Sequence, residues 1–437
     1  MNYNDTMAYI KNTAKFGSNY GLSRTEKILE LLDSPHKKLK CIHIAGTNGK
    51  GSTSAMLSNI LIEAGYKVGM YTSPFLIDFE ERIQINNKNI LKSDLCLIVD
   101  KVKLAVDEVI KLGYEHPTEF EIITCAAFLY FYEKEVDYAV IEVGLGGRLD
   151  STNVITPILS VITSISLDHM QILGNSLESI AKEKAGIIKK GIPVVLYPQK
   201  DECKAVIEKA CISNCSKLIC VKIDSAKLLE VNFKENIPSQ KIQVTTKNNS
   251  YHVDLALLGG HQLLNCSTVI HCVEQLIDQG IVIKDEAIVN GLIKVIWKGR
   301  LEVMGKNPLI VIDGAHNIDA IINLNSSLKQ YFKYKNIVLI LGILADKEVE
   351  QMVKVITSEA KKVITVTPNS IRAENSHDLR NIVLKYNKNC VSEVDYEKAL
   401  NIGLSSLEDE DLLLLCGSLY MIGDMRKIIK KVLRPTN

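Results

Sequence analysis

The sequence lacks the features of membrane, secreted and nucleic-acid-binding proteins. Its 437 residues contain no apolar run near the roughly 18 residues that a membrane-spanning helix needs. No basic segment followed by an apolar stretch stands at the N-terminus, so no signal peptide is predicted. Neither charge is in excess, because 52 Lys and Arg stand against 51 Asp and Glu. We therefore expect a cytoplasmic protein that binds neither membranes nor nucleic acid, although a local cluster could still bind an anionic substrate.

Cysteine is present, but not in a metal-binding pattern. The eleven cysteines include no C-x-x-C pair, and the densest group has no histidine nearby. That group consists of Cys203, Cys211, Cys215 and Cys220. We interpret the cysteines as buried free thiols of a reducing compartment rather than as a zinc site.

Strand-like and helix-like segments alternate over the first half of the chain. The predicted strands are Lys40–Ala45, Tyr66–Tyr71, Asp137–Val143 and Ile158–Thr163, and the helices are Ser52–Ala64, Ser93–Leu112, Glu119–Glu133 and Leu177–Lys189. Continuous apolar strands separated by helices indicate an α/β fold with a parallel sheet. Short, polar-interrupted β segments between Lys217 and Leu258 predict a small antiparallel appendage on this domain. Helices over His261–Gln279 and Lys284–Ile296 follow it.

The alternation restarts after Trp297 and predicts a second, smaller doubly wound domain. Its predicted strands are Leu309–Asp313, Asn336–Leu341, Lys362–Val366 and Asp411–Cys416. Its predicted helices are Ile318–Phe332, Lys347–Glu359, Ser376–Tyr386, Tyr396–Ser405 and Leu419–Val432. We place the two domains at residues 1–297 and 298–437.

The most specific motif is the run GTNGKGST at residues 46–53, between the first predicted strand and a helix. Its glycines let backbone N–H groups turn toward phosphate oxygens at a helix N-terminus, where Lys50 adds a positive charge. The usual phosphate-loop pattern would have a glycine at position 44 and a hydroxyl at position 51, where Ile44 and Gly51 stand. The predicted ATP-binding residues of this loop are Thr47, Asn48, Gly49, Lys50, Gly51, Ser52 and Thr53.

This loop and further motifs in the same order resemble the folylpolyglutamate synthases, members of the Mur ligase superfamily. The motifs are Tyr71–Phe75 with Glu81 and Arg82, Pro117–Glu121, Ile141–Asn153, Leu167–His169, Ala181–Ile188, Lys298–Arg300, Asp313–Asn317, Gly342–Lys347 and Gly417–Tyr420. They run from about residue 40 to residue 420, so the resemblance covers nearly the whole chain.

The resemblance implies an ATP-dependent ligase that adds L-glutamate to the γ-carboxylate of folate. A carboxylate is a poor electrophile for an amine, so it must first become an acyl phosphate. Attack of a carboxylate on the γ-phosphate needs dense positive charge, from Lys50 and magnesium. The resemblance assigns catalytic roles to Lys50, Lys184 and His316.

Two magnesium ions and a modified lysine are implied in the same way. Glu142 ends a predicted strand, where α/β proteins form their sites, and offers the oxygen ligand that magnesium prefers. By resemblance, Glu142 and Ser73 ligate one ion and His169 helps to hold the other. The resemblance further implies that Lys184 carries a carbamate that ligates the second ion, which requires a lowered lysine pKa.

The remaining site residues also come from the resemblance. Asn265, Arg300 and Asp313 match ATP-binding positions, and Arg300 fits a charge that domain closure delivers. His316 and Ser418 match glutamate-binding positions. The folate-side positions are Thr72, Pro74, Phe75, Arg82, Thr118, Arg148, Asp150 and Asn153. We expect folate, L-glutamate and ATP as ligands of a monomeric enzyme.

Two alternatives stay open beside this interpretation. A Mur-type ligase of peptidoglycan precursors shares the chemistry, but only about 40 residues precede the loop, too few for a nucleotide-sugar domain. A P-loop switch ATPase would leave the motifs at 142–153 and 313–317 unexplained. Whether dihydropteroate is a second substrate is undecided, and Arg148 resembles the version common in bifunctional members.

Overall fold

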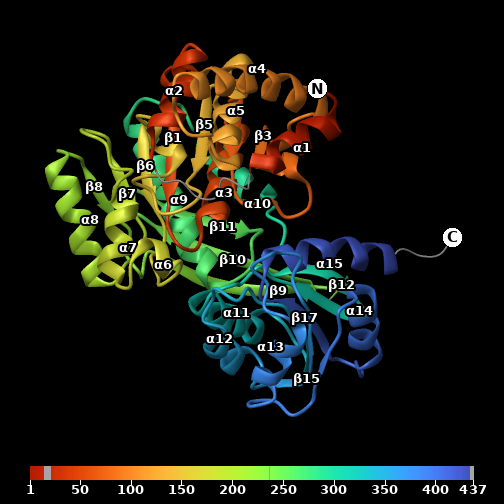
Figure 1. The fold of residues 1–437 in the computed structure, drawn as a ribbon. Coiled ribbons are helices and arrows are strands. Elements are labelled where there is room, and N and C mark those ends of the chain that lie inside the picture. The colour runs from red at the N-terminus through yellow and green to blue at the C-terminus, as the bar shows by residue number, and fades with distance from the viewer. Residues whose placement is uncertain (14–20, 236, 434–437) are drawn as a thin grey trace. The chain divides into compact units, whose positions relative to one another are not determined.

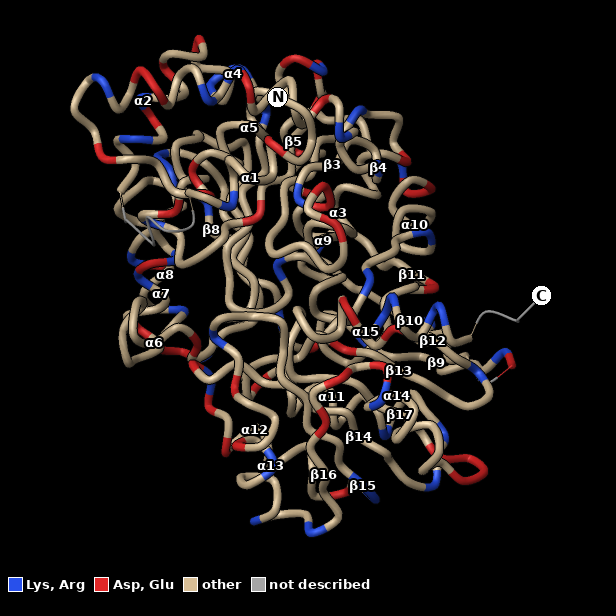
Figure 2. Tube along the Cα trace, turned by 45° about the vertical axis from the view of Figure 1, so that its right-hand side comes forward, with Lys and Arg blue, Asp and Glu red and all other residues tan. Residues whose placement is uncertain are grey.

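The computed structural model describes residues 1–13, 21–235 and 237–433, which form two compact units (Figure 1). The first unit consists of Met1–Ala226, Val244–Tyr251 and Leu264–Val295. The second consists of Lys227–Gln243, His252–Leu263 and Ile296–Asn437, apart from the residues outside the described ranges. Acidic and basic residues are interspersed along the chain in both units (Figure 2).

The first unit is built on an eight-stranded sheet in the order β4-β3-β2-β5-β1-β6-β7-β8. The strands from β2 through β8 in this order are parallel, whereas β3 and β4 are antiparallel additions at one edge. Their bounds are β1 Cys41–Ala45, β2 Val68–Tyr71, β3 Ile83–Ile85, β4 Lys88–Asn89, β5 Tyr138–Glu142, β6 Leu159–Ile162, β7 Val194–Leu196 and β8 Leu218–Cys220. The central β1 and β5 are buried along their whole length, as their continuous apolar sequences predict.

Helices enclose this sheet around two apolar cores. One core joins α4 and α5 to β2 and β5, and the other joins α7 and α8 to β6 and β7. The helices are α1 Tyr3–Thr13, α2 Ser23–Leu31, α3 Lys50–Glu63, α4 Lys92–Lys111, α5 Glu119–Glu133, α6 Met170–Leu173, α7 Leu177–Ala185, α8 Asp201–Ser213, α9 Gly260–Asp278 and α10 Asp285–Lys294. The first four residues of α9, up to Leu263, belong to the second unit. Short 3-10 turns lie at Pro35–Lys38, Phe79–Arg82 and Ser151–Val154.

The second unit has a six-stranded sheet in the order β12-β13-β17-β14-β15-β16, in which only β12 is antiparallel to its neighbour. Its strands are β12 Glu302–Lys306, β13 Leu309–Ile312, β14 Ile337–Leu341, β15 Ala360–Thr365, β16 Cys390–Ser392 and β17 Leu412–Cys416. Its helices are α11 Ile318–Tyr331, α12 Val349–Ile356, α13 Ser376–Val383, α14 Tyr396–Ser405 and α15 Leu419–Val432. The α/β class and the smaller C-terminal parallel sheet are therefore confirmed.

The antiparallel strands form a separate three-stranded sheet, β11-β10-β9, with bounds β9 Ala226–Lys234, β10 Ile237–Thr245 and β11 Ser250–Leu255. We expected this sheet on the first domain, whereas most of its residues pack with the second unit. The reason is a polar contact deep in that unit: Tyr331 donates a hydrogen bond to Gln240 Oε1 at 2.6 Å, and Gln240 Nε2 donates to the Leu257 carbonyl.

All eleven cysteines are free thiols, as predicted, and nine of them are buried. The expected burial was wrong for Cys215 and Cys220, which are exposed. Across the described residues, no helix combines the length and the apolar character that crossing a bilayer requires.

Candidate active site

The phosphate loop connects β1 to α3, which begins at Lys50. Gly49 has φ +88°, and a Cβ atom there would lie 2.7 Å from Asn265 Oδ1. Only glycine fits this position, because a side chain would meet both a strained backbone and a clash. Asn265, buried on α9, therefore lies directly against the loop, so the structure brings together two sets of predicted ATP-binding residues.

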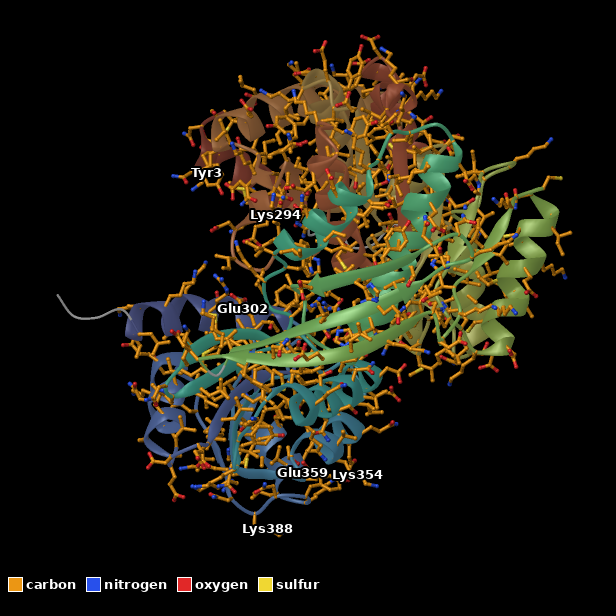
Figure 3. All side chains as sticks on the ribbon, turned by 180° about the vertical axis from the view of Figure 1, so that it is seen from behind. Tyr3, Lys294, Glu302, Lys354, Glu359 and Lys388 are labelled. Atoms are coloured by element: carbon orange, nitrogen blue, oxygen red, sulfur yellow. The ribbon has the colours of Figure 1, made fainter. Side chains whose placement is uncertain are left out.

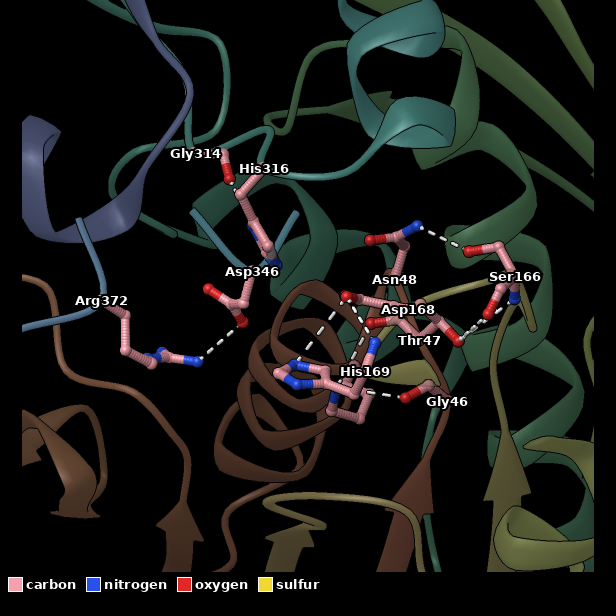
Figure 4. Close-up of polar contacts among 11 residues, drawn as sticks. Gly46, Thr47, Asn48, Ser166, Asp168, His169, Gly314, His316, Asp346 and Arg372 are labelled. Carbon is pink, nitrogen blue, oxygen red and sulfur yellow. Dashed lines mark hydrogen bonds and ion pairs between the residues drawn. The ribbon is translucent and has the colours of Figure 1, made fainter. Parts of the chain in front are cut away.

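Residues that follow β6 fix the shape of the loop (Figure 4). Thr47 N donates to the Ser164 carbonyl at 2.7 Å, and Thr47 Oγ1 donates to the Ser166 carbonyl at 3.1 Å. Asn48 Nδ2 lies 3.3 Å from Ser166 Oγ. The side chains of Thr47 and Asn48 thus shape the loop. Ser164 and Ser166 were missed in the sequence, although polar residues directly after a predicted strand were a usable signal.

Lys50 folds back over the loop. Its ammonium group donates to the carbonyl of Gly46 at 3.1 Å and to that of Thr47 at 3.3 Å. Ser52 and Thr53 are buried in the first turn of α3, and Thr53 Oγ1 has no hydrogen-bond partner. Gly51 is half-buried beside them. The arrangement places a positive charge and a helix N-terminus at one point, as phosphate binding requires.

Glu142 and Ser73 lie at the carboxyl ends of two neighbouring parallel strands. Glu142 ends β5, and Ser73 follows β2, which pairs with β5 up to Tyr71 and Ile141. The Ser73 backbone N donates to Glu142 Oε2 at 3.3 Å, and the Glu142 side chain is buried. The two residues predicted to share a magnesium ion are therefore in contact.

Lys184, on α7, is buried with 2% of its surface exposed. Burial lowers the pKa of this amine from 10.5 to about 7, and the positive charge of Lys50 adds to the effect. Asp168 and Asp150 act in the opposite direction, so Lys184 lies within electrostatic range of both carboxylates and of the phosphate loop. The lowered pKa that the resemblance requires of Lys184 is present.

His169 stands between β6 and α6 and has φ +51°. Its backbone N donates to Asp168 Oδ1 at 2.8 Å, and its Nε2 lies 3.9 Å from the same oxygen (Figure 4). Asp168 was given no role in the prediction, even though it stands in the Leu167–His169 motif. The structure places its carboxylate beside both His169 and the charge of Lys184.

Hydrogen bonds and an ion pair hold the turn after β5 against α7, the helix that carries Lys184. Arg148 N donates to the Glu183 carbonyl at 2.8 Å, and Arg148 Nη2 lies 2.9 Å from Glu183 Oε1. Asn153 Nδ2 donates to the carbonyls of Arg148 and Gly186, both at 3.0 Å. The Asn153 Oδ1 atom is buried and has no hydrogen-bond partner. Arg148 and Asn153 therefore position Lys184 in addition to any contact with substrate.

Asp150 holds the same turn from inside. Its carboxylate accepts hydrogen bonds from Leu145 N at 2.9 Å, from Thr152 N at 3.0 Å and from the Thr152 hydroxyl. Burial raises the pKa of Asp150, and these hydrogen bonds oppose the rise. His43 Nε2, on β1, lies 2.9 Å from Thr152 Oγ1 and extends the network into the sheet. The structure thus gives Asp150 a structural role that its sequence position did not reveal.

The loop after β2, which was predicted to bind folate, makes aromatic and polar contacts within the first unit. The Arg82 guanidinium lies 5.4 Å from the ring centroids of both Phe75 and Phe79. Thr72 N donates to the Arg82 carbonyl at 3.0 Å, and Pro74 is exposed. Arg82 Nη2 lies 3.8 Å from a carboxylate oxygen of Glu119, whereas Arg82 Nε is buried without a partner.

Thr118 is the N-cap of α5. Its hydroxyl accepts a hydrogen bond from Glu121 N at 3.3 Å, and its own N donates to Glu121 Oε2 at 2.7 Å, which is a capping box. Arg24 Nε binds Glu121 Oε1 at 3.0 Å in a buried ion pair. Arg24 was not predicted, because no local sequence pattern links α2 to the start of α5.

In the second unit, Asp313 fixes the segment that contains Arg300. Asp313 Oδ2 accepts from Leu301 N and Oδ1 from Ala315 N, both at 2.8 Å. Burial raises the pKa of Asp313, and the charge of Arg300 opposes the rise. Arg300 Nη1 donates to the Gly299 carbonyl at 3.1 Å. Arg300 and Asp313, the two predicted ATP-binding residues of this unit, therefore belong to one hydrogen-bonded group of residues.

His316 and Ser418 follow β13 and β17, two neighbouring parallel strands. Gly417 N donates to the Ala315 carbonyl at 3.1 Å, which brings the two strand ends together. His316 Nδ1 lies 2.8 Å from the Gly314 carbonyl (Figure 4). Ser418 is 1% exposed, and its Oγ neither caps α15 nor has any hydrogen-bond partner. A buried hydroxyl without a partner is costly and points to a ligand.

The Mur ligase middle domain family matches residues 44–273, and the glutamate ligase domain of Mur ligases matches residues 299–419. The dihydrofolate synthase/folylpolyglutamate synthase of Bacillus subtilis (strain 168) is 38% identical over 432 residues, covering 98% of this chain and 99% of that protein. The chain belongs to the folylpolyglutamate and dihydrofolate synthase family. The folylpolyglutamate synthase of Lacticaseibacillus casei is 34% identical, covering 98% of this chain and 99% of that protein.

Solved structures of the family agree with the fold. The Mycobacterium tuberculosis folylpolyglutamate synthase complexed with ADP superimposes with a TM-score of 0.90 at 26% identity, covering 98% of this chain and 99% of that chain. As a folylpolyglutamate and dihydrofolate synthase family member, the chain is a ligase of the Mur type.

Proposed function

We propose that the protein adds L-glutamate to the γ-carboxylate of a folate, with ATP converted to ADP and phosphate through an acyl phosphate. The supporting observation is that Lys184 is buried, with 2% of its surface exposed, on a helix whose Glu183 carbonyl accepts a hydrogen bond from Arg148 N in the turn after Glu142. The positive charge of Lys50 adds to the effect of burial in lowering the pKa of Lys184. A P-loop switch ATPase has no use for a second, buried lysine near its phosphate loop.

The phosphate loop supplies the charge for the first step. The N-terminus of α3 and the Lys50 ammonium group bind the phosphates of ATP. When ATP binds, Lys50 gives up its hydrogen bonds to the carbonyls of Gly46 and Thr47 and donates to phosphate oxygens instead. A carboxylate oxygen of folate then attacks the γ-phosphorus and ADP leaves. Lys50 offsets the negative charge that both reactants bring together.

Magnesium and a carbamate on Lys184 are part of the proposal. Glu142 and Ser73 would hold one ion, and His169 and carbamylated Lys184 the other. Bound magnesium supplies further positive charge to the phosphate oxygens. The residues fit such ions, because the buried Glu142 carboxylate lies at hydrogen-bond distance from Ser73 N and about half of the Lys184 amines are neutral at pH 7. The neutral amine forms an N–C bond with carbon dioxide and releases one proton.

The second unit supplies the groups for glutamate. Ser418 Oγ, buried without a partner, offers a hydrogen bond to a glutamate carboxylate, and His316 lies at the neighbouring strand end. The amino group of glutamate attacks the carbonyl carbon of the acyl phosphate, the C–N bond forms and phosphate leaves. Arg300 and Asp313 belong to the proposed ATP site.

We further propose that the same site accepts dihydropteroate as a second acid substrate. The Bacillus subtilis relative carries both activities in its name, and Arg148 is held beside the Lys184 helix by Glu183. The remaining folate-side groups are Thr72, Pro74, Phe75, Arg82, Thr118, Asp150 and Asn153. The proposal also includes a monomeric enzyme. A cytoplasmic location is supported by the eleven free thiols, which suit a reducing compartment.

A substrate panel tests the proposal. Purified protein with ATP, magnesium and L-glutamate is offered dihydropteroate, tetrahydrofolate and its formyl and methylene derivatives, and ADP release and product mass are measured. We expect turnover with at least one tetrahydrofolate and with dihydropteroate. ADP release that is independent of both glutamate and the folate would refute the ligase assignment, and no product from dihydropteroate would refute only the second activity.

A further inference from the structure

The segment Gly299–Leu301, which carries Arg300, has an unusual backbone. Gly299 has φ +72° and Leu301 has φ +42°. A positive φ is disfavoured for leucine and persists only where surrounding contacts impose it. Leu301 N donates to Asp313 Oδ2, Gly314 N donates to the Gly299 carbonyl, and both distances are 2.8 Å. The tertiary structure therefore holds this segment in place.

Glu302, the first residue of β12, adds a further restraint (Figure 3). Its Oε2 accepts a hydrogen bond from Gly299 N at 2.8 Å. The Arg426 guanidinium binds both oxygens of the same carboxylate, with Nε at 2.9 Å from Oε1 and 3.1 Å from Oε2, and Nη2 at 2.6 Å from Oε1. The Arg426 side chain is 8% exposed and that of Glu302 is 21% exposed. An Arg–carboxylate pair with this geometry and burial is strongly directional.

Arg426 connects the Arg300 segment to the glutamate-binding region of the same unit. It lies on α15, which begins directly after Ser418 and packs against β12 and β17 (Figure 1). Arg426 stands about 12 Å along the helix from Ser418. One ion pair therefore restrains both the backbone that presents Arg300 and the helix that begins beside the unpartnered Ser418 hydroxyl.

We propose that Arg426 and Glu302 are positioning residues of the ligation reaction: their ion pair sets the place of Arg300 and of the helix that follows Ser418. The inference rests on the proposed function, in which Arg300 binds ATP and Ser418 binds glutamate. A displaced binding group weakens substrate binding even when the fold survives. An ion pair that only stabilised the fold would change the amount of active enzyme and would leave the KM values unchanged.

Arg426→Gln in the full-length enzyme tests this inference. We expect KM for ATP and KM for glutamate each to rise by about tenfold or more, while KM for the folate, whose proposed binding residues lie in the first unit, changes by less than about twofold. Lys329→Gln is the matched control, because it breaks an exposed ion pair with Glu359, at 2.6 Å, in the same unit. The control should keep all three KM values. In Arg426→Ala, added guanidinium ion at low millimolar concentration should lower both raised KM values.

Unchanged KM values for ATP and glutamate in folded Arg426→Gln would overturn the inference. If that variant does not fold, Arg426→Lys tests the inference instead, since it keeps the positive charge and loses the bidentate contact with Glu302. Intermediate increases of both KM values then support the inference, and wild-type values contradict it. A wild-type enzyme without folate- and glutamate-dependent ADP release refutes the proposed function instead, so the two failures are distinguishable.

Discussion

Lys184 provides the sharpest test of the site chemistry. At pH 7.5 a lysine with its ordinary pKa of 10.5 is neutral in about one molecule in a thousand, whereas a pKa of about 7 makes about three-quarters of the amines neutral. Only the neutral amine adds carbon dioxide. Lys184→Arg keeps the positive charge but remains protonated and forms no carbamate. We expect its turnover to fall by about a hundredfold or more, the size of effect that loss of one electrostatic group has on turnover.

Lys184→Ala is the companion variant. It removes the proposed oxygen ligand and leaves space, so a short acid such as acetate should restore part of the activity. The assay is ADP release at saturating ATP, folate and glutamate, in buffer with and without bicarbonate. A Lys184→Arg enzyme with near-wild-type turnover, together with an unmodified lysine in the mass spectrum of the magnesium-loaded native protein, would refute the carbamate.

The same pKa shift predicts how stability depends on pH in metal-free, carbon-dioxide-free buffer. Between pH 7 and 10.5 the unfolded chain holds a proton on Lys184 that the folded chain lacks, so stability rises with pH across this window. The cost of burying the charged amine is fully present below pH 7 and amounts to at most about 5 kcal/mol. Lys184→Met should therefore raise the free energy of unfolding more at pH 6 than at pH 10, as measured by urea titration. An equal effect at both pH values would contradict the lowered pKa.

Three further variants probe other parts of the site. Lys50→Ala should lower turnover by about a hundredfold to a thousandfold at saturating ATP without changing the circular dichroism spectrum, and near-wild-type turnover would reject the phosphate-loop assignment. His316→Ala should raise KM for glutamate far more than KM for ATP, and equal increases would count against its placement. Arg24→Gln leaves the Glu121 carboxylate buried without its ionic partner, so urea unfolding should show a loss of about 3 kcal/mol; a loss below about 0.5 kcal/mol would mean that the pair is dispensable.

The sequence predicted the parts of the fold that local patterns specify. The bounds of α5, α14 and α15 agree with the predicted helices to the residue, because each begins at a cap or at a change from an apolar strand to a helical repeat. The strands β7, β8 and β16 have only three residues each, and β4 has two. Segments this short carry no recognisable periodicity, and tertiary hydrogen bonds alone make them strands.

Candidate site residues were predicted from the sequence wherever a motif carries its own chemistry, as in the phosphate loop, and their roles stay predictions. Contacts between distant segments were not predicted, such as those between Arg24 and Glu121 and between Thr47 and Ser166. No sequence pattern shows that Asp150 and Thr118 are occupied by internal hydrogen bonds, since capping and ligand binding use the same side chains. The burial that lowers the pKa of Lys184 depends on how a turn packs against α7, which periodicity does not encode.

An isotope-transfer measurement shows whether ligation passes through an acyl phosphate. Folate labelled with ¹⁸O in the γ-carboxylate is incubated with the enzyme, ATP, magnesium and L-glutamate, and the released phosphate is analysed by ³¹P NMR or mass spectrometry. We expect one ¹⁸O atom in each phosphate formed, because the attacking carboxylate oxygen leaves with the phosphoryl group. Phosphate that stays unlabelled while glutamate is added to the folate would contradict this expectation.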